Sequence, residues 1–377
     1  MKRKGVWILG GALIMTACSW SLKPDVMSFD ESSNFRDGTF QNAQSFEVSE
    51  GGTMAKILWR YMTEERIDAM PVDPVPVHAM NPATLVEENQ AGVAIYRLGH
   101  SSLLLAVEGT FWLIDPVFSE RASPFSWIGP KRFHKTPLEL AQLPEITGVL
   151  ISHDHYDHLD KDTIRQLSQR VEHFVVPLGV GNHLREWGVE NERIHELDWW
   201  QNVSVGEVEL TATPSQHFSG RGLRDRNTTL WASWVIKASD KMVYFSGDTG
   251  YFDGFKEIGE RLGPFDLTIM ENGAYDQNWS QVHMTPEETL QAHLDLKGDV
   301  MLPVHNGTFD LAMHPWYEPL ERLDALAVDA QVTLVTPEMG QRLALTELST
   351  ASTQRWWRTG SIAQRSIGNA DELKHSM

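Results

Sequence analysis

The stretch VLISHDHYDHLD, residues Val149–Asp160, places imidazole and carboxylate side chains directly after an apolar run. The run Gly148–Ile151 predicts a short buried strand, and the polar residues follow in the loop that leaves it, ahead of a helix near Asp160. Burying so many polar groups without partners would cost several kcal/mol, so a metal ion is the simplest common partner. Imidazole and carboxylate groups suit zinc, manganese or iron, and no thiolate is nearby. The candidate ligands are His153, His155, Asp157 and His158.

The spacing of these ligands indicates two metal positions. His153 and His155 are alternate residues and can converge on one ion, whereas Asp157 and His158, further along the loop, can reach a second. The alternative is a solvated polar loop that happens to be rich in histidine. The density of the residues and their place after a strand favour the metal site.

The segment HDHYDHLD resembles the H-x-H-x-D-H signature of the metallo-β-lactamase superfamily. This resemblance implies three further ligands at strand ends, and the chain offers His217 after VELTATPSQ, Asp248 in KMVYFSGDTG and His305 after VMLPV. The likeness extends to the branch of N-acyl-phosphatidylethanolamine-hydrolysing phospholipase D enzymes. It is carried over about residues 90–345 by segments that include GPKRFHKTP, WASWVI, YFSGDTGY, NGAYDQNW, HMTPEE and HNGTF.

The resemblance implies an α/β protein with an αββα sandwich, the metallo-β-lactamase fold. It also implies a ligand assignment in which one metal ion is held by His153, His155 and His217, the other by Asp157, His158 and His305, and both by a bridging Asp248. Two Zn²⁺ ions are the expected cofactors, and other divalent metals fit the same ligands. The ions bring four positive charges, and two carboxylates with a bridging hydroxide remove three, so one charge remains for an anionic phosphodiester.

The implied mechanism uses a metal-bound hydroxide, with Asp248 and Asp157 as the catalytic carboxylates. The resemblance also implies a substrate contact by His283 and a supporting position behind the ligands for His100. Tyr156 and Tyr275 are further candidates to form a wall of the substrate pocket. From the residues alone, a hydrogen-bonded turn histidine and ordinary aromatic packing remain open as alternatives.

Composition excludes some classes of partner. The chain has 377 residues, of which 41% are hydrophobic and 22% charged, and its formal net charge is −19. Nucleic-acid binding depends on lysine and arginine stripes that are missing here, so we expect no nucleic-acid partner. The sequence has one cysteine, Cys18, which excludes an intrachain disulfide and a multi-thiolate metal site. Nothing in the sequence predicts the oligomeric state.

The first 18 residues resemble a bacterial lipoprotein signal. A basic start precedes the apolar run Val6–Met15, and the segment ends in Met15-Thr16-Ala17-Cys18, where Cys18 would be lipidated after cleavage. Ser19 after the cysteine favours the outer membrane. We therefore expect an outer-membrane lipoprotein of the cell envelope that faces the periplasm; an uncleaved anchor helix is the alternative.

The remaining chain divides into three parts. Residues 19–90 read as a polar tether with an amphipathic helix over Thr53–Met70, which would touch the membrane or pack on the domain. Residues 91–346 form the expected catalytic domain, with its two β-rich halves divided near residue 215. Residues 347–377 read as a polar tail.

The sequence thus predicts a zinc-dependent hydrolase, of phospholipase D type, that cleaves a membrane phospholipid. The expected reaction converts N-acyl-phosphatidylethanolamine to phosphatidic acid and N-acylethanolamine. A lactonase or other small-ester hydrolase could use the same two metals. The non-enzymatic alternative is an envelope lipoprotein in which the metal site is structural, although a complete ligand set argues against it.

Overall fold

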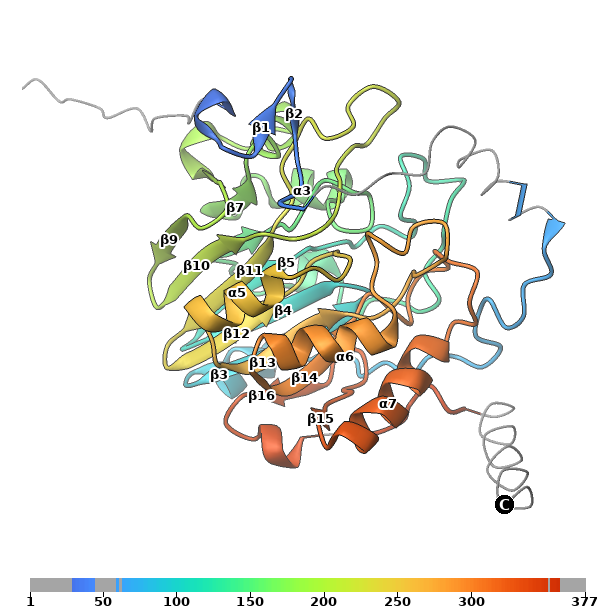
Figure 1. Ribbon diagram of the computed structural model, residues 1–377. Coiled ribbons are helices and arrows are strands. Elements are labelled where there is room, and N and C mark those ends of the chain that lie inside the picture. Colours follow the sequence, from blue (N-terminus) through green and yellow to red (C-terminus); the bar gives the residue numbers. More distant parts are fainter. Residues whose placement is uncertain (1–28, 45–58, 61–62, 352, 360–377) are drawn as a thin grey trace, which may run out of the picture.

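The computed structural model describes residues 29–44, 59–60, 63–351 and 353–359. Two β-sheets pack face to face, and helices cover their outer faces (Figure 1). This arrangement confirms the expected αββα sandwich. The lipoprotein signal, including Cys18, lies outside the described residues.

The first sheet has seven strands in the order β16-β3-β4-β5-β6-β7-β8. Strands β3 to β5 are antiparallel, whereas β5 to β8 run parallel. The central strands are buried on both faces, which explains their nearly continuous apolar sequences. The strands are β3 (Val93–Gly99), β4 (Ser102–Val107), β5 (Thr110–Ile114), β6 (Gly148–Leu150), β7 (His173–Pro177), β8 (Ile194–Leu197) and β16 (Arg342–Ala344).

The second sheet also has seven strands, in the order β15-β14-β13-β12-β11-β10-β9. Strands β9 to β12 form an antiparallel meander, and β12 to β15 are parallel. The strands are β9 (Asn202–Val205), β10 (Val208–Thr213), β11 (Ser233–Ala238), β12 (Lys241–Phe245), β13 (Phe265–Glu271), β14 (Gly298–Val304) and β15 (Thr333–Leu334). The halves therefore divide between β8 and β9, not near residue 215, and β16 returns to the first sheet.

Three apolar clusters hold these layers together. The largest lies between the sheets and includes Trp112 and Trp234. A second lies under α3 and α4, and a third under α5, α6 and α7. The α-helices are α2 (Pro82–Leu85), α3 (Lys161–Leu167), α4 (Gly181–Glu186), α5 (Gly254–Arg261), α6 (Pro286–Asp295) and α7 (Glu318–Ala330). Short 3₁₀ turns span Phe29–Glu31, Glu87–Asn89, Leu140–Gln142, Asn191–Arg193 and Leu348–Thr350.

The N-terminal segment packs more closely than expected for a tether. Residues 29–44 contain a small hairpin, β1 (Phe35–Arg36) and β2 (Thr39–Phe40), whose Phe40 is fully buried in the core between the sheets. The expectation of a loose arm was therefore wrong for this segment, because spaced phenylalanines anchor it. The predicted helix Thr53–Met70 is described only at residues 59–60 and 63–70. Trp59, Arg60 and Thr63 are helical, but residues 64–70 form bends and turns, so the prediction was wrong for this second part.

The C-terminal segment also belongs partly to the folded domain. Trp356 and Trp357 are buried in a cluster with Trp316, Leu320 and Met339. The Trp357 indole donates to Glu321 on α7 over 2.8 Å. The described chain is packed on the domain to about Arg358, so the predicted domain boundary at residue 346 was too early. The polar composition beyond residue 346 gave no sign of this packing.

Candidate metal centre

Strand ends from both sheets bring the candidate ligands to one place. The loop with His153, His155, Asp157 and His158 leaves β6, and the remaining ligands follow β10, β12 and β14. These are His217, Asp248 and His305. Three of the strands, β6, β12 and β14, have parallel neighbours, and the carboxyl ends of parallel strands meet at a shared sheet edge.

The first ligand cluster consists of His153, His155, His217 and Asp248. Nε2 of His153 lies 2.9 Å from Nδ1 of His155, and Nε2 of His217 lies 3.3 Å from the same atom. The Asp248 carboxylate is 3.7 Å from His153 and 3.8 Å from His217. Three ring nitrogens so close together are explained when their lone pairs converge on a cation.

The second cluster consists of His100, Asp157, His158 and His305. Asp157 Oδ2 lies 3.6 Å from Nε2 of His158 and 3.4 Å from Nε2 of His305. It also contacts Nε2 of His100 at 2.9 Å. His100 therefore holds the carboxylate from behind, which agrees with the supporting position implied by the resemblance.

Asp248 lies between the clusters. It is 3.1 Å from Nε2 of both His158 and His305. Despite these distances, Asp248 Oδ1 and the Nε2 atoms of both histidines are buried without a hydrogen-bond partner in the described part of the chain. Atoms that are close but not aligned for hydrogen bonding suit ligands of a common ion, so the donor set fits a shared metal centre.

Buried acceptors fix the orientation of the ligand imidazoles. Asp115, at the end of β5, accepts from Nδ1 of His158 at 2.7 Å and from both the amide and hydroxyl of Ser152. The backbone oxygen of Val282 accepts from Nδ1 of His217 at 3.0 Å. Each contact keeps Nε2 free to face the centre, as outer carboxylates and carbonyls do around metal-bound histidines.

The two clusters differ in electrostatics. Burial lowers the pKa of His153 and of His217 well below the ordinary value, so these rings remain neutral. Burial opposes protonation of His158 and His305 as well, but Asp248 and Asp157 raise the pKa of His305 to about 10 and that of His158 well above its usual value. Without a metal, the second cluster holds protons where the first does not.

A family model described as "Beta-lactamase superfamily domain" matches residues 110–306, from β5 to just beyond His305. The chain belongs to the metallo-β-lactamase superfamily. With its clustered histidine and aspartate ligands, it is a metal-dependent hydrolase of that superfamily.

Similar proteins support this placement. A Mycobacterium tuberculosis protein named as uncharacterized is 41% identical over 95% of this chain and all of its own length. The N-acyl-phosphatidylethanolamine-hydrolyzing phospholipase D 1 of Caenorhabditis elegans is 33% identical over 80% of this chain and 91% of its own. The structure of an isothiocyanate hydrolase from Delia radicum gut bacteria gives a TM-score of 0.53 at 19% identity, over 67% of this chain and 98% of its own. The last likeness concerns the fold alone.

The three residues expected to contact the substrate lie in three different environments. His283 lies with Asp248 and His305, with one ligand atom from each residue within 4.8 Å of the others. Tyr156 donates its hydroxyl to the Arg221 carbonyl and lines a separate cavity. Tyr275 donates its hydroxyl to Glu318, the first residue of α7, and stacks on His314 in the segment that precedes this helix.

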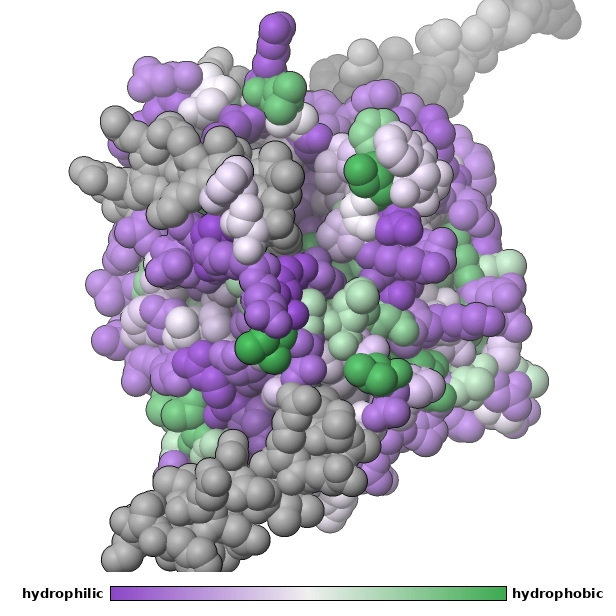
Figure 2. All heavy atoms as spheres, turned by 90° about the vertical axis from the view of Figure 1, so that its right-hand side faces the viewer, coloured by the Kyte–Doolittle hydropathy of each residue, from purple (hydrophilic) through white to green (hydrophobic). Residues whose placement is uncertain are grey.

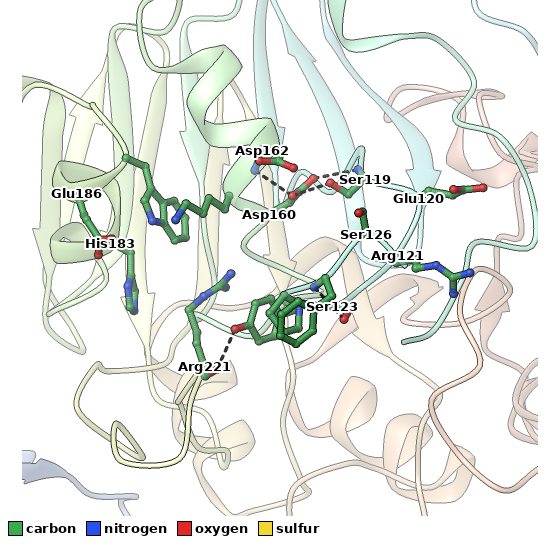
Figure 3. Close-up of a pocket in the computed structure, with 15 residues that line it drawn as sticks. Ser119, Glu120, Arg121, Ser123, Ser126, Asp160, Asp162, His183, Glu186 and Arg221 are labelled. Carbon is green, nitrogen blue, oxygen red and sulfur yellow. Dashed lines mark hydrogen bonds between the residues drawn. The ribbon is translucent and has the colours of Figure 1, made fainter. Parts of the chain in front are cut away.

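The cavity that Tyr156 lines has a volume of about 560 Å³ and lies against the metal loop (Figure 3). The Arg221 guanidinium packs over the Tyr156 ring at 4.0 Å and near Trp187 at 5.1 Å, and donates to the carbonyls of Asp154 and Leu159. Arg221 therefore stabilises the metal loop through two of its carbonyls and also lines the cavity.

Sequence reasoning missed three residues that support the centre: Asn42, Asp115 and Glu271. Asp115 follows β5 directly and Glu271 is the last residue of β13, so a polar residue at the end of an apolar strand could have marked both. Asn42 had no local signal. Its side chain donates to the His217 carbonyl at 2.7 Å and accepts from the His217 amide at 3.0 Å, so the N-terminal segment holds a ligand from 175 residues away.

Asn42→Ala tests this support. The substitution removes both hydrogen bonds to His217 and one from the Trp231 indole, so we expect the unfolding free energy to fall by about 1–3 kcal/mol. Metal affinity should fall with it. Denaturant unfolding of the metal-free protein and chelator competition measure both. Gln41→Ala is the matched control because, within the described part of the chain, the Gln41 side chain bonds only Thr39. Equal effects from both variants would refute the role of Asn42.

The contrast between the clusters predicts pH-dependent metal binding. Protons on His158 and His305 compete with a metal ion, so affinity at the second cluster should rise with pH by roughly tenfold per pH unit per released proton. For the His305 proton, whose pKa is about 10, this rise should continue up to about pH 10. The neutral rings of the first cluster should show little dependence over the same range. Calorimetric titration of the metal-free protein in buffers of different ionisation enthalpy counts the released protons. Binding of both ions without proton release would contradict the assignment.

Proposed function

We propose that this chain is a dinuclear zinc phosphodiesterase of phospholipase D type. The substrate would be N-acyl-phosphatidylethanolamine, cleaved to phosphatidic acid and N-acylethanolamine. The observation that carries the proposal is the shared position of Asp248 between two ligand clusters, in a chain 33% identical over 80% of its length to a phospholipase named for this substrate.

The described residues suit an anionic phosphodiester at this centre. His153, His155 and His217 would hold one ion, Asp157, His158 and His305 the other, and Asp248 both. When bound, the two ions supply positive charge and lower the pKa of a bound water molecule. The chain itself positions the ligands, through Asp115, Val282 and His100, and leaves His283 beside the centre to contact the substrate.

A lipid substrate also requires an approach for its acyl chains. Phe125, Trp127 and Ile128 are 53%, 72% and 51% exposed, and Phe125 lies at the rim of the cavity that Tyr156 lines. Figure 2 shows that the face on the right-hand side of Figure 1 is mostly hydrophilic, with hydrophobic side chains in small separate groups. Exposed aromatic residues beside a cavity suit contact with a lipid surface. Such apolar contacts would be needed because a protein with a net charge of −19 is not attracted electrostatically to an anionic membrane.

A lipid-panel assay tests the proposal. The metal content is first measured, and about two zinc ions per chain are expected. The protein is then incubated with vesicles of N-acyl-phosphatidylethanolamine and, separately, with a simple lactone. We expect higher kcat/KM for the phospholipid and release of N-acylethanolamine. A preference for the lactone would favour small-ester hydrolysis, and cleavage on the glycerol side of the phosphate would exclude the phospholipase D reaction.

Asp248→Asn is the matched active-site variant in this assay. The amide has the size of the carboxylate but lacks the charge shared by both clusters, so we expect a loss on the order of a thousandfold in turnover. Circular dichroism should show an intact fold. A variant within a few-fold of wild type would show that Asp248 does not bridge two ions.

We also propose that residues 1–18 direct the protein to the outer membrane, facing the periplasm, with lipid on Cys18. The support is the signal-like sequence that ends in the one cysteine of the chain. Among the described residues, no helix is long and apolar enough to cross a membrane.

Cys18→Ser should abolish lipid attachment and leave the precursor uncleaved or released from the membrane. Fractionation of the full chain and mass spectrometry of its mature N-terminus measure this outcome. An unmodified Cys18 thiol in the mature wild-type protein would refute the proposed anchor.

A further inference from the structure

Glu271 is a fully buried carboxylate beside the metal centre that is not among the metal ligands. Glu271 is the last residue of β13, which pairs in parallel with β12. The chain leaving β12 passes through Ser246 and reaches Asp248 two residues later. The Glu271 amide donates to Ser246 Oγ at 2.8 Å, which fixes the two strand ends together. Burying a carboxylate is costly unless hydrogen bonds compensate it, so its partners indicate its role.

Both carboxylate oxygens of Glu271 are occupied. Oε2 accepts from the backbone amide of Thr249, the residue after Asp248, at 2.6 Å. Oε1 contacts Nδ1 of His283. A single carboxylate therefore joins the loop that carries the shared ligand to the histidine beside the centre.

The segment that carries His283 is also fastened to the ligands. The Val282 carbonyl accepts from His217, and Gln281 packs so tightly on Gly250 that a Cβ there would lie 2.0 Å from the Gln281 oxygen. The His283 ring lies 5.2 Å from His217 and 5.3 Å from His305 between ring centroids. Its side chain is 14% exposed, whereas Glu271 is fully enclosed, so His283 is the accessible end of the pair.

We propose that Glu271 is a positioning residue that holds His283 as the Nδ1–H tautomer, with Nε2 available to substrate or water at the metal centre. An ionised carboxylate can only accept hydrogen bonds, so Nδ1 must carry the hydrogen. Nε2 is then the ring nitrogen left for other contacts. The tautomer of a histidine is set by the hydrogen bond of its other nitrogen, and Glu271 supplies that bond. Only the substrate in this inference depends on the proposed function.

Glu271→Gln keeps the shape of the side chain but changes its ability to accept and donate hydrogen bonds. The amide has nearly the same volume, but one of its two arms is a donor. If its oxygen keeps the Thr249 amide, its NH₂ group faces Nδ1 of His283 and shifts the ring hydrogen to Nε2. The fold should remain intact while the accessible nitrogen changes from acceptor to donor.

The decisive measurement is the tautomer of His283 in the zinc-loaded full chain. Long-range ¹H–¹⁵N NMR of the imidazole should show a protonated Nδ1 in wild type and a protonated Nε2 in Glu271→Gln, with His283→Gln used to assign the signals. Glu196→Gln is the matched control. Glu196 also accepts a backbone amide, from Gly179 at 2.8 Å, but its ion-pair partner is Arg185 on α4.

Kinetics provide the second measurement. In the lipid assay, Glu271→Gln should lower kcat by roughly 100-fold with little change in KM, and adding His283→Gln should cause no comparable further loss. Glu196→Gln should leave kcat within a few-fold of wild type. A protonated Nε2 in wild type, or an unchanged tautomer in Glu271→Gln, would overturn the inference. If the lipid is not hydrolysed at all, the proposed function fails, but the NMR result still decides the role of Glu271.

Discussion

The Asp248 carboxylate lies within reach of imidazoles from both ligand clusters, and this shared contact constrains the whole site. A buried carboxylate between several buried imidazoles requires either shared protons or shared cations. The geometry favours cations, because Asp248 Oδ1 and two facing Nε2 atoms lack hydrogen-bond partners in the described chain. Everything around Asp248 then serves to keep these ligand atoms directed inward.

The sandwich provides this direction by ending strands of both sheets near one another. Apolar residues along the strands form the core, and polar residues follow them at the strand ends. The hydrophobic core therefore extends as far as the metal centre. Asp115 and Glu271 occupy such positions and bind neighbouring loops instead of metal. Burial raises the pKa of Glu271, against the opposing effect of the His283 imidazole, which agrees with a carboxylate whose ionised form depends on its partners.

A local signal, dense histidines after an apolar run, predicted the ligand loop that follows β6. The αββα fold and the ligands His217, Asp248 and His305 were implied by the family resemblance. Spacing had already indicated two metal positions for the four residues of this loop, and the resemblance assigned the three later ligands to them. Residues with a non-local role were missed. Asn42 acts on His217 only after the N-terminal hairpin has packed on the core, and Trp357 anchors a segment whose composition is polar. The division of the halves was misplaced because β9 and β10 belong to the second sheet although they precede His217.

The backbone of the centre also carries strain. His100, Asp115 and His305 have φ angles of 55°, 42° and 63°, in the left-handed region that residues other than glycine rarely occupy. Each costs on the order of 1 kcal/mol or more, and the surrounding hydrogen bonds must offset it. The Thr308 hydroxyl accepts from the His100 amide at 2.6 Å, and the His305 amide donates to the His100 carbonyl, so two of the strained residues restrain each other. Metal binding to the folded chain adds stability to this same conformation, because an unfolded chain cannot present the ligands together. Of these three residues, His305 belongs to the assigned ligand set, so metal binding would offset part of the cost of its backbone conformation.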